Sequence, residues 1–223
     1  WGLANALVFK KVRAGLGLDR CRYCLTGAAP IARETMDFFI SLNLPLLELY
    51  GMSENTGPHT LSVPTRWRVT SVGTEFPGVS TKLDSADDEG NGEICMSGRH
   101  VFMGYLNMEE KTAEATDRDG WLHTGDIGRK DKDGYLFITG RIKELIITAG
   151  GENVAPVPIE DSVKEELPIV SNCMLIGDQK KFLSILLTLK TEVDLDTSVP
   201  LDALTGPALE WCQQQGSASK SVT

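Results

Sequence analysis

Hydroxyl and carboxylate side chains follow directly after two apolar segments of the sequence. Ser53 and Glu54 come after Leu46–Tyr50 and a glycine, Gly51, while Asp126 comes after Trp121-Leu122-His123-Thr124-Gly125. A serine hydroxyl can donate to a phosphate, a glutamate oxygen suits Mg²⁺, and an aspartate at a strand end can accept from both hydroxyls of a ribose. Glycine lets the backbone approach a ligand. The alternatives stay open at this point: Ser53 as a helix N-cap and Asp126 as a turn residue that bonds its own backbone.

Two cations and a pair of glycines follow further along the chain. Arg141 and Lys143 lie between two short apolar runs, and an arginine there can clamp a phosphate or sugar with two parallel hydrogen bonds. Gly150 and Gly151 give the backbone the freedom needed by a loop that passes close to a ligand or changes conformation. A hairpin with solvated charges and an ordinary turn explain the same residues without a ligand.

The five cysteines and three histidines give a weaker signal. Cys21 and Cys24 have the C-x-x-C spacing of a redox pair or of half a zinc site, but a second half-site is missing from the sequence. We therefore favour reduced cysteines on a buried strand and a reducing, cytoplasmic compartment. His123 has no neighbour in the sequence that would indicate a catalytic base.

The predicted secondary structure that positions these residues changes along the chain and divides it into three parts. Residues 1–68 follow a strand, glycine turn, helix, strand rhythm that predicts part of a parallel α/β sheet. Residues 69–142 hold short apolar runs between frequent Gly and Asp turns, which predicts a β-barrel-like subdomain. Residues 143–223 predict an incomplete small α+β domain. The particular expectations are a helix with Pro30 in its first turn, strands at Arg22–Thr26, Val170–Ile176 and Phe182–Leu189, and short helices at Leu201–Leu204 and Ala208–Trp211.

Composition excludes several classes of protein. The 223 residues carry a net charge of −9 with a pI near 4.9, which disfavours binding to nucleic acid through its phosphates. A hydrophobic content of 41% is enough to bury a core, which excludes global disorder. Uninterrupted apolar runs are only a few residues long, so a transmembrane segment is not expected.

The order of these motifs carries more information than any one of them. The segments Tyr50–Glu54, Gly92-Glu93 with Gly104-Tyr105, Trp121–Asp126, Gly140–Glu144 and Gly150–Pro156 together resemble the adenylate-forming superfamily, which includes acyl-CoA synthetases, luciferases and peptide-synthetase adenylation domains. The runs Gly-Gly-Glu-Asn-Val-Ala-Pro and Leu-Tyr-Gly-Met-Ser-Glu-Asn-Thr are similar to those of bubblegum-type long-chain fatty acyl-CoA synthetases. The resemblance covers almost the whole chain.

The resemblance implies a role for each matching residue. Gly27, Ala28, Ala29 and Pro30 match, with Thr26, the loop along the adenine, and Tyr50 matches the aromatic ring that stacks on it. Ser53 matches the α-phosphate contact, Glu54 the carboxylate on the magnesium side, Asp126 the ribose-binding aspartate and Arg141 the arginine that reaches ribose and phosphate. Lys143 falls on the hinge between the large and small domains. Gly150 and Gly151 match the loop that lines the pantetheine tunnel, and Gly51 belongs to the motif of Tyr50.

The implied reaction joins a long-chain fatty acid to CoA at the expense of ATP, with Mg²⁺, through an acyl-AMP intermediate. The superfamily's Gly/Ser/Thr-rich phosphate loop with its lysine and its late catalytic lysine have no match in the sequence, so we expect an internal fragment that is inactive alone. Two alternatives remain: an adenylate former with a different acid, and a truncated product that binds nucleotide or a partner without catalysis. A cytoplasmic location is expected, with peripheral contact to the endoplasmic reticulum membrane left open. Chain-length preference and oligomeric state are not indicated.

Overall fold

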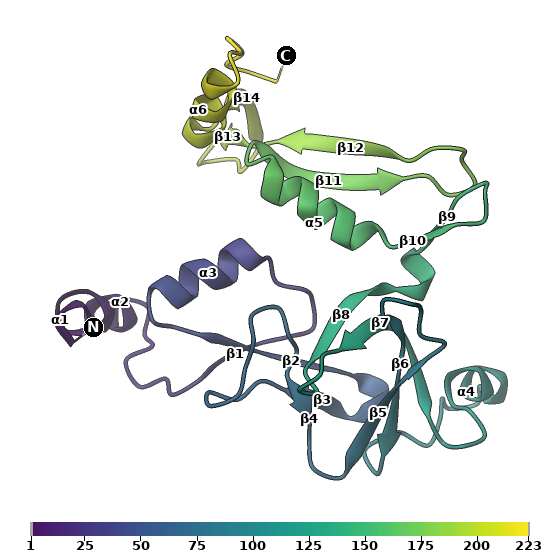
Figure 1. Cartoon of the computed structure of the whole chain (residues 1–223). Coiled ribbons are helices and arrows are strands. Elements are labelled where there is room, and N and C mark those ends of the chain that lie inside the picture. The colour runs from purple at the N-terminus through teal and green to yellow at the C-terminus, as the bar shows by residue number, and fades with distance from the viewer. Residues whose placement is uncertain (1, 223) are drawn as a thin grey trace. The chain divides into compact units, whose positions relative to one another are not determined.

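The computed structural model describes residues 2–222, which form helices and several separate sheets (Figure 1). The chain divides into two compact units, Trp1–Ile138 and Thr139–Thr223, and each is described by itself. The α/β class predicted from the sequence is confirmed. The domain boundaries after residues 68 and 142 stay a prediction.

The first sheet of unit 1 has the strand order β1-β2-β3-β4. β1 and β2 are parallel, with Cys24 opposite Leu46, as the strand–helix–strand rhythm predicts. β2 and β3 are antiparallel, and they approach closely at Gly51, where an added Cβ atom would lie 1.9 Å from the carbonyl oxygen of Gly57. Only glycine fits there. The elements are α1 (Gly2–Ala4), η1 (Asn5–Phe9), α2 (Lys10–Gly15), β1 (Cys24–Thr26), α3 (Arg33–Ser41), β2 (Leu46–Met52), η2 (Ser53–Asn55), β3 (Gly57–Leu61) and β4 (Thr74–Glu75).

The second sheet of unit 1 has the order β5-β6-β7-β8 and pairs β5, β6 and β7 antiparallel. It is an open sheet and does not close into a barrel in the described residues. Alternating side chains of these strands join Tyr50 of β2 in one buried cluster, formed by Tyr50, Val72, Ile94, Met96, Leu122 and Leu136. The elements are β5 (Val79–Asp84), β6 (Gly92–Gly98), α4 (Glu109–Ala115), β7 (Leu122–Lys130) and β8 (Leu136–Arg141), which continues into unit 2.

Unit 2 packs short elements around a smaller apolar cluster. The hairpin β11–β12 is antiparallel, and its strand Val170–Ile176 has the bounds predicted from the sequence. The cluster contains Ile169, Val170, Leu204, Ala208 and Cys212. The elements are η3 (Ile142–Glu144), β9 (Ile146–Ile147), β10 (Asn153–Val154), α5 (Pro156–Glu166), β11 (Val170–Ile176), β12 (Ser184–Leu189), β13 (Thr191–Val193), β14 (Pro200–Leu204) and α6 (Gly206–Gln214).

Three local expectations were wrong. Pro30 does not begin a helix, because Ala28 has a left-handed φ of 71° and Ala32 is extended, so α3 starts only at Arg33. The segment Leu201–Leu204 is a strand, because it pairs with β13. Cys21 is exposed and precedes β1, while Cys24 is half-buried at the start of that strand, so the C-x-x-C pair is not buried on a strand.

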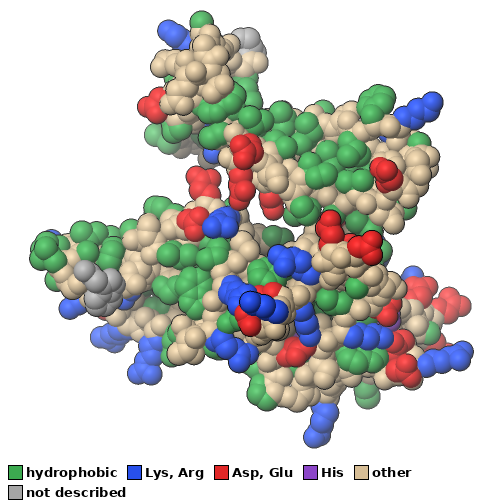
Figure 2. All heavy atoms as spheres, viewed as in Figure 1, with side chains coloured by type: hydrophobic (Ala, Val, Ile, Leu, Met, Phe, Trp, Pro, Cys, Tyr) green, Lys and Arg blue, Asp and Glu red, His purple; other side chains and the backbone are tan. Residues whose placement is uncertain are grey.

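The helices and the surface charges of the structure can be compared with the composition. Within residues 2–222, no helix combines the length and the apolar character that crossing a bilayer requires. Acidic and basic side chains are intermixed on the face shown in Figure 2.

Candidate functional site

A buried tyrosine–aspartate pair joins the two sheets of unit 1. The Tyr50 hydroxyl donates to Asp126 Oδ2 over 2.7 Å, although the two residues lie 76 positions apart in the sequence. Each is only 8% exposed. Tyr50 is in β2 and Asp126 in β7, so the two residues that the sequence analysis matched to adenine and ribose contacts are neighbours.

The backbone of β7 bulges at Asp126. Glu93 pairs with Ile127 and Cys95 pairs with His123, so the single residue Ile94 of β6 faces the three residues 124–126 of β7. A bulge of this kind bends a strand and redirects its side chains. Gly125 has a φ of 72°, a conformation that glycine adopts without strain.

Side chains replace the ladder hydrogen bonds within this bulge. The Gly125 amide donates to Glu93 Oε1 over 3.0 Å, and the Asp126 amide donates to Thr124 Oγ1 over 3.1 Å. The Thr124 hydroxyl in turn donates to the Ile94 carbonyl over 2.7 Å. The bulge therefore has a defined shape, and its last residue presents the carboxylate that Tyr50 contacts.

Ser53 and Glu54 lie in the single turn η2, immediately after β2. Ser53 is exposed, whereas Glu54 is half-buried and accepts a hydrogen bond of 2.7 Å from the hydroxyl of Tyr105. This bond raises the pKa of Tyr105. A carboxylate held in this way retains the hard oxygen donors that suit Mg²⁺, so Glu54 fits the metal contact proposed for it.

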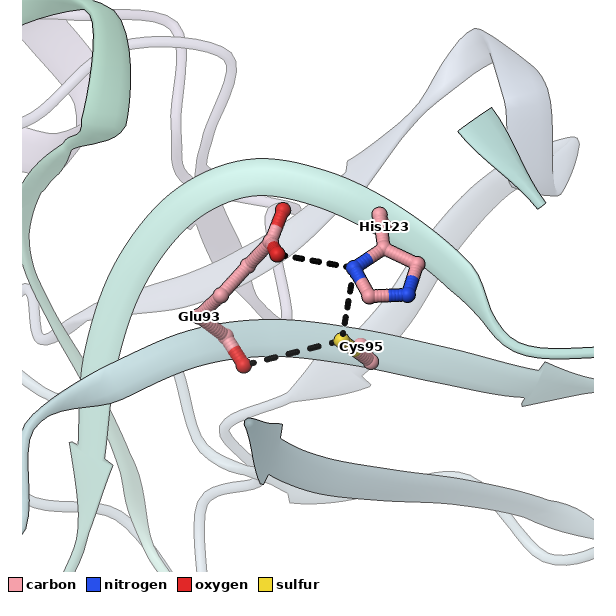
Figure 3. A group of neighbouring side chains, drawn as sticks. All are labelled: Glu93, Cys95 and His123. Carbon is pink, nitrogen blue, oxygen red and sulfur yellow. Dashed lines mark hydrogen bonds and ion pairs between the residues drawn. The ribbon is translucent and has the colours of Figure 1, made fainter. Parts of the chain in front are cut away.

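Glu93, Cys95 and His123 form a cluster beside the bulge (Figure 3). His123 Nδ1 lies 2.7 Å from Glu93 Oε2 and 3.5 Å from Cys95 Sγ, and His123 Nε2 lies 3.6 Å from an oxygen of Asp117. The hydrogen bond with Glu93 raises the pKa of His123, and burial raises the pKa of Cys95 to about 12.

The same three side chains are of types that bind zinc, and their ligand atoms lie within 4.8 Å of one another. In this structure, however, both carboxylate oxygens of Glu93 accept hydrogen bonds from β7, and the Cys95 thiol is held neutral by burial. Glu93, Cys95 and His123 therefore form a polar contact between β6 and β7, which we call the brace.

The segment Gly27–Pro30 follows β1 and is exposed. Gly27 lies against Leu49 of β2, where an added Cβ atom would meet Leu49 Cδ1 at 2.6 Å. The loop therefore leaves its strand beside the strand that carries Tyr50, as expected for neighbouring parallel strands.

The remaining predicted residues belong to unit 2. Arg141 ends β8 and Lys143 lies in η3, and both are exposed. Gly150 and Gly151 form the turn between β9 and β10, where Gly151 has a φ of 84° and donates to the carbonyl of Thr148 over 2.9 Å. The functions assigned to these residues stay predictions.

Sequence reasoning missed the partners of several site residues. Nothing in the sequence pairs His123 with Glu93, because that contact depends on the register of β6 against β7. Tyr105 was recognised only as part of a motif, and its contact with Glu54 spans 51 positions. A glutamate opposite a Thr-Gly-Asp bulge is a signal that becomes visible only once the strand pairing is known.

Two family models match the chain, "AMP-binding enzyme" over residues 3–106 and "AMP-binding enzyme C-terminal domain" over residues 143–219. The chain belongs to the family of AMP-binding enzymes. The adenylate-forming resemblance of the sequence motifs is thereby confirmed.

Relatives of this AMP-binding enzyme chain include a long-chain-fatty-acid–CoA ligase, ACSBG2, of Gallus gallus, which is 62% identical over 221 residues. The match covers 99% of the chain but only 29% of that relative. Among solved structures, ATP-bound MatB from Rhodopseudomonas palustris is 31% identical with a TM-score of 0.66, covering 90% of this chain and 40% of MatB. O-succinylbenzoate CoA synthetase (MenE) from Bacillus subtilis, in complex with ATP and magnesium, is 26% identical with a TM-score of 0.64, covering 95% of this chain and 45% of MenE.

Proposed function

We propose that the chain supplies the nucleotide-binding part of an ATP-dependent long-chain fatty acid–CoA ligase. The observation that carries the proposal is the buried contact between Tyr50 and Asp126, which places an aromatic ring of β2 beside a carboxylate at the bulge of β7. An aromatic ring can stack on adenine, and a buried carboxylate can accept from both ribose hydroxyls. The 62% identity to a long-chain-fatty-acid–CoA ligase supports the choice of acid and of CoA as acceptor.

The reaction has two half-reactions. The fatty-acid carboxylate attacks the α-phosphorus of ATP, which gives acyl-AMP and pyrophosphate, and the CoA thiol then displaces AMP to give acyl-CoA. Bound Mg²⁺ would neutralise charge on the phosphates. Asp126 holds the ribose, Ser53 donates to the α-phosphate, Glu54 lies on the magnesium side and Arg141 reaches ribose and phosphate. These contacts fix ATP in place while charge develops at the phosphorus.

The other assignments concern the rest of the nucleotide and the acceptor. The adenine is lined by Gly27, Ala28, Ala29 and Pro30, and the channel for the pantetheine arm of CoA is lined by Gly150 and Gly151.

A cytoplasmic location is supported by the five cysteines, all of which are free thiols in the structure. Contact with the endoplasmic reticulum membrane stays a prediction.

The decisive experiment replaces Asp126 by alanine in the assay protein. This term means the longest natural polypeptide that contains the 223 residues. Loss of charge-assisted hydrogen bonds to a buried sugar costs about 1.5–3 kcal/mol, so the KM for ATP should rise roughly ten- to a hundredfold. The KM for the fatty acid should stay near its original value, because Asp126 does not contact the acid.

The matched control is Asp119→Ala, which removes an exposed aspartate from the turn before the same strand. It should leave both KM values unchanged. Unchanged kinetics with ATP in Asp126→Ala would contradict the proposed nucleotide site.

A further inference from the structure

The starting observation is that one carboxylate holds the bulge of β7 at two points. Glu93 Oε1 accepts from the Gly125 amide over 3.0 Å, and Oε2 lies 2.7 Å from His123 Nδ1. Glu93 is on β6, the neighbour of the strand that bulges, and its two contact residues lie on either side of Thr124 in the sequence. Figure 3 shows the contact with His123. Because residues 124–126 face only Ile94, the Gly125 amide depends on a side chain for its hydrogen bond.

The Glu93–His123 pair is partly shielded from solvent and has further charged side chains close to it. The side chains of His123 and Glu93 are 26% and 19% exposed. Asp117, in the turn before β7, approaches His123 from its other ring nitrogen, and Lys82 of β5 contacts Asp117 over 3.2 Å. Cys95 adds a neutral thiol. A protonated imidazole is attracted to both neighbouring carboxylates, those of Glu93 and Asp117, and this attraction stabilises the observed positions of the three side chains.

We propose that Glu93 is a positioning residue, which fixes Thr124-Gly125-Asp126 in the shape that presents the Asp126 carboxylate to the nucleotide ribose. The inference rests on the proposed function, because it needs Asp126 to bind ATP. Glu93 itself contacts the β7 backbone and His123, and its effect on ATP passes through Asp126.

A conservative replacement separates positioning from bulk packing. Glu93→Gln keeps the size of the side chain and one carbonyl oxygen, but it removes the negative charge that pairs with His123. One of the two contacts is then weakened, and the bulge becomes more mobile. The KM for ATP of the assay protein should rise about tenfold while kcat changes less than about twofold, because the loss is in ground-state binding of the nucleotide.

Two measurements test the brace without an assay of enzyme activity. In nuclear magnetic resonance titrations of the chain, the pKa of His123 should fall in Glu93→Gln, because the carboxylate whose hydrogen bond raises it is gone. Amide exchange at Gly125 should become faster, because its acceptor is weakened. A side chain that only filled space would leave the His123 titration unchanged.

The KM for ATP should also depend on pH through this pair. The groups facing His123 are Glu93 and Cys95 from β6 and Asp117 from the turn before β7, with Lys82 of β5 behind Asp117. As pH rises through the pKa of His123, the ion pair is lost and the KM for ATP should rise. In Glu93→Gln, which has no Glu93–His123 ion pair to lose, this pH-dependent rise should be absent.

The controls separate failure of this inference from failure of the proposed function. Glu89→Gln makes the same change at an exposed position between β5 and β6 and should leave every readout unchanged. His123→Gln keeps the Glu93–Gly125 contact and should raise the KM for ATP by less than Glu93→Gln does. If Asp126→Ala raises the KM for ATP but Glu93→Gln does not, the positioning role is wrong and the proposed function stands. If Asp126→Ala has no effect on ATP, both are overturned.

Discussion

His59 is a buried histidine whose side chain is hydrogen-bonded at both ring nitrogens. Its Nδ1 lies 2.9 Å from Nε2 of His100 and its Nε2 lies 2.8 Å from the hydroxyl of Thr81, and the residue is fully buried. Burial, with His100 as a second cause, lowers the pKa of His59 to about 4. The imidazole is therefore neutral in the folded protein at neutral pH and acts as a structural link between β3 and β5.

This residue should make the free energy of unfolding depend on pH. A histidine in the unfolded chain has a pKa near 6.5, so below that pH the unfolded state takes up a proton that the folded state does not. Stability should fall as pH drops from about 6.5 towards 4, by about 2 kcal/mol between pH 7 and pH 5. Urea denaturation of the wild type and of His59→Gln at both pH values measures this contribution as the difference between the two proteins.

His123 of β7, in the other sheet of unit 1, gives an internal comparison. The pKa of His123 is raised, so its contribution is present below the unfolded pKa and is lost as pH rises through the folded pKa. Replacing His123 should therefore lower stability at acid pH by a constant amount and remove the fall in stability above about pH 6.5, while the acid-side slope caused by His59 stays unchanged. An identical acid-side pH dependence in wild type and His59→Gln would contradict the assignment for His59.

At the scale of elements, the chain passes from one compact unit to the other within β8. The division between them falls after Ile138, and Lys143 lies in the short turn η3 that follows Arg141. The superfamily resemblance places a hinge at Lys143, and a hinge must change its backbone angles when a domain rotates.

Lys143→Pro tests this hinge in the assay protein. Proline fixes φ near −65°, so it should block one of two domain orientations and abolish either adenylate formation or thioester formation, but not both. Pyrophosphate release measures the first half-reaction, and conversion of preformed acyl-AMP to acyl-CoA measures the second. Lys143→Ala should preserve both, and an equal loss of the two in Lys143→Pro would indicate a folding defect or a direct chemical role instead.

Some elements could be predicted from sequence because their signals are local. The β11 strand is rich in apolar residues and ends at the turn residues Gly177 and Asp178, and the β1–α3–β2 rhythm indicates a parallel pair. Leu201–Leu204 was misassigned because leucines three apart fit a helix turn as well as a strand, and only pairing with β13 decides between them. Similarly, Asp126 was found from its motif, whereas its contact with Tyr50 and its support by Glu93 depend on long-range register.

At the scale of the whole molecule, the chain spans 29% of the ligase from Gallus gallus that it matches. The 223 residues contain Glu54 and Arg141 but no match to the superfamily's phosphate loop with its lysine. Stabilising negative charge on the β- and γ-phosphates needs such preorganised donors, and loss of even one typically costs about 10²–10³ in rate.

We therefore expect the 223-residue chain to make no acyl-CoA by itself. The measurement is pyrophosphate release with ATP, Mg²⁺ and a long-chain fatty acid, with the assay protein as the active comparison. Circular dichroism of the same sample shows whether the chain is folded. Turnover in the range of ordinary ligases, about 1 s⁻¹ or more, would mean that residues other than a glycine-rich loop bind the phosphates.

The contact at Gly51 has a consequence for inherited variation. Any other residue at this position would place a Cβ atom 1.9 Å from the carbonyl oxygen of Gly57, so β2 and β3 would have to separate. Tyr50 and the turn that carries Glu54 flank this point. A missense allele that replaces Gly51 would therefore behave as a loss of the folded sheet, with reduced protein abundance, rather than as a selective defect in catalysis.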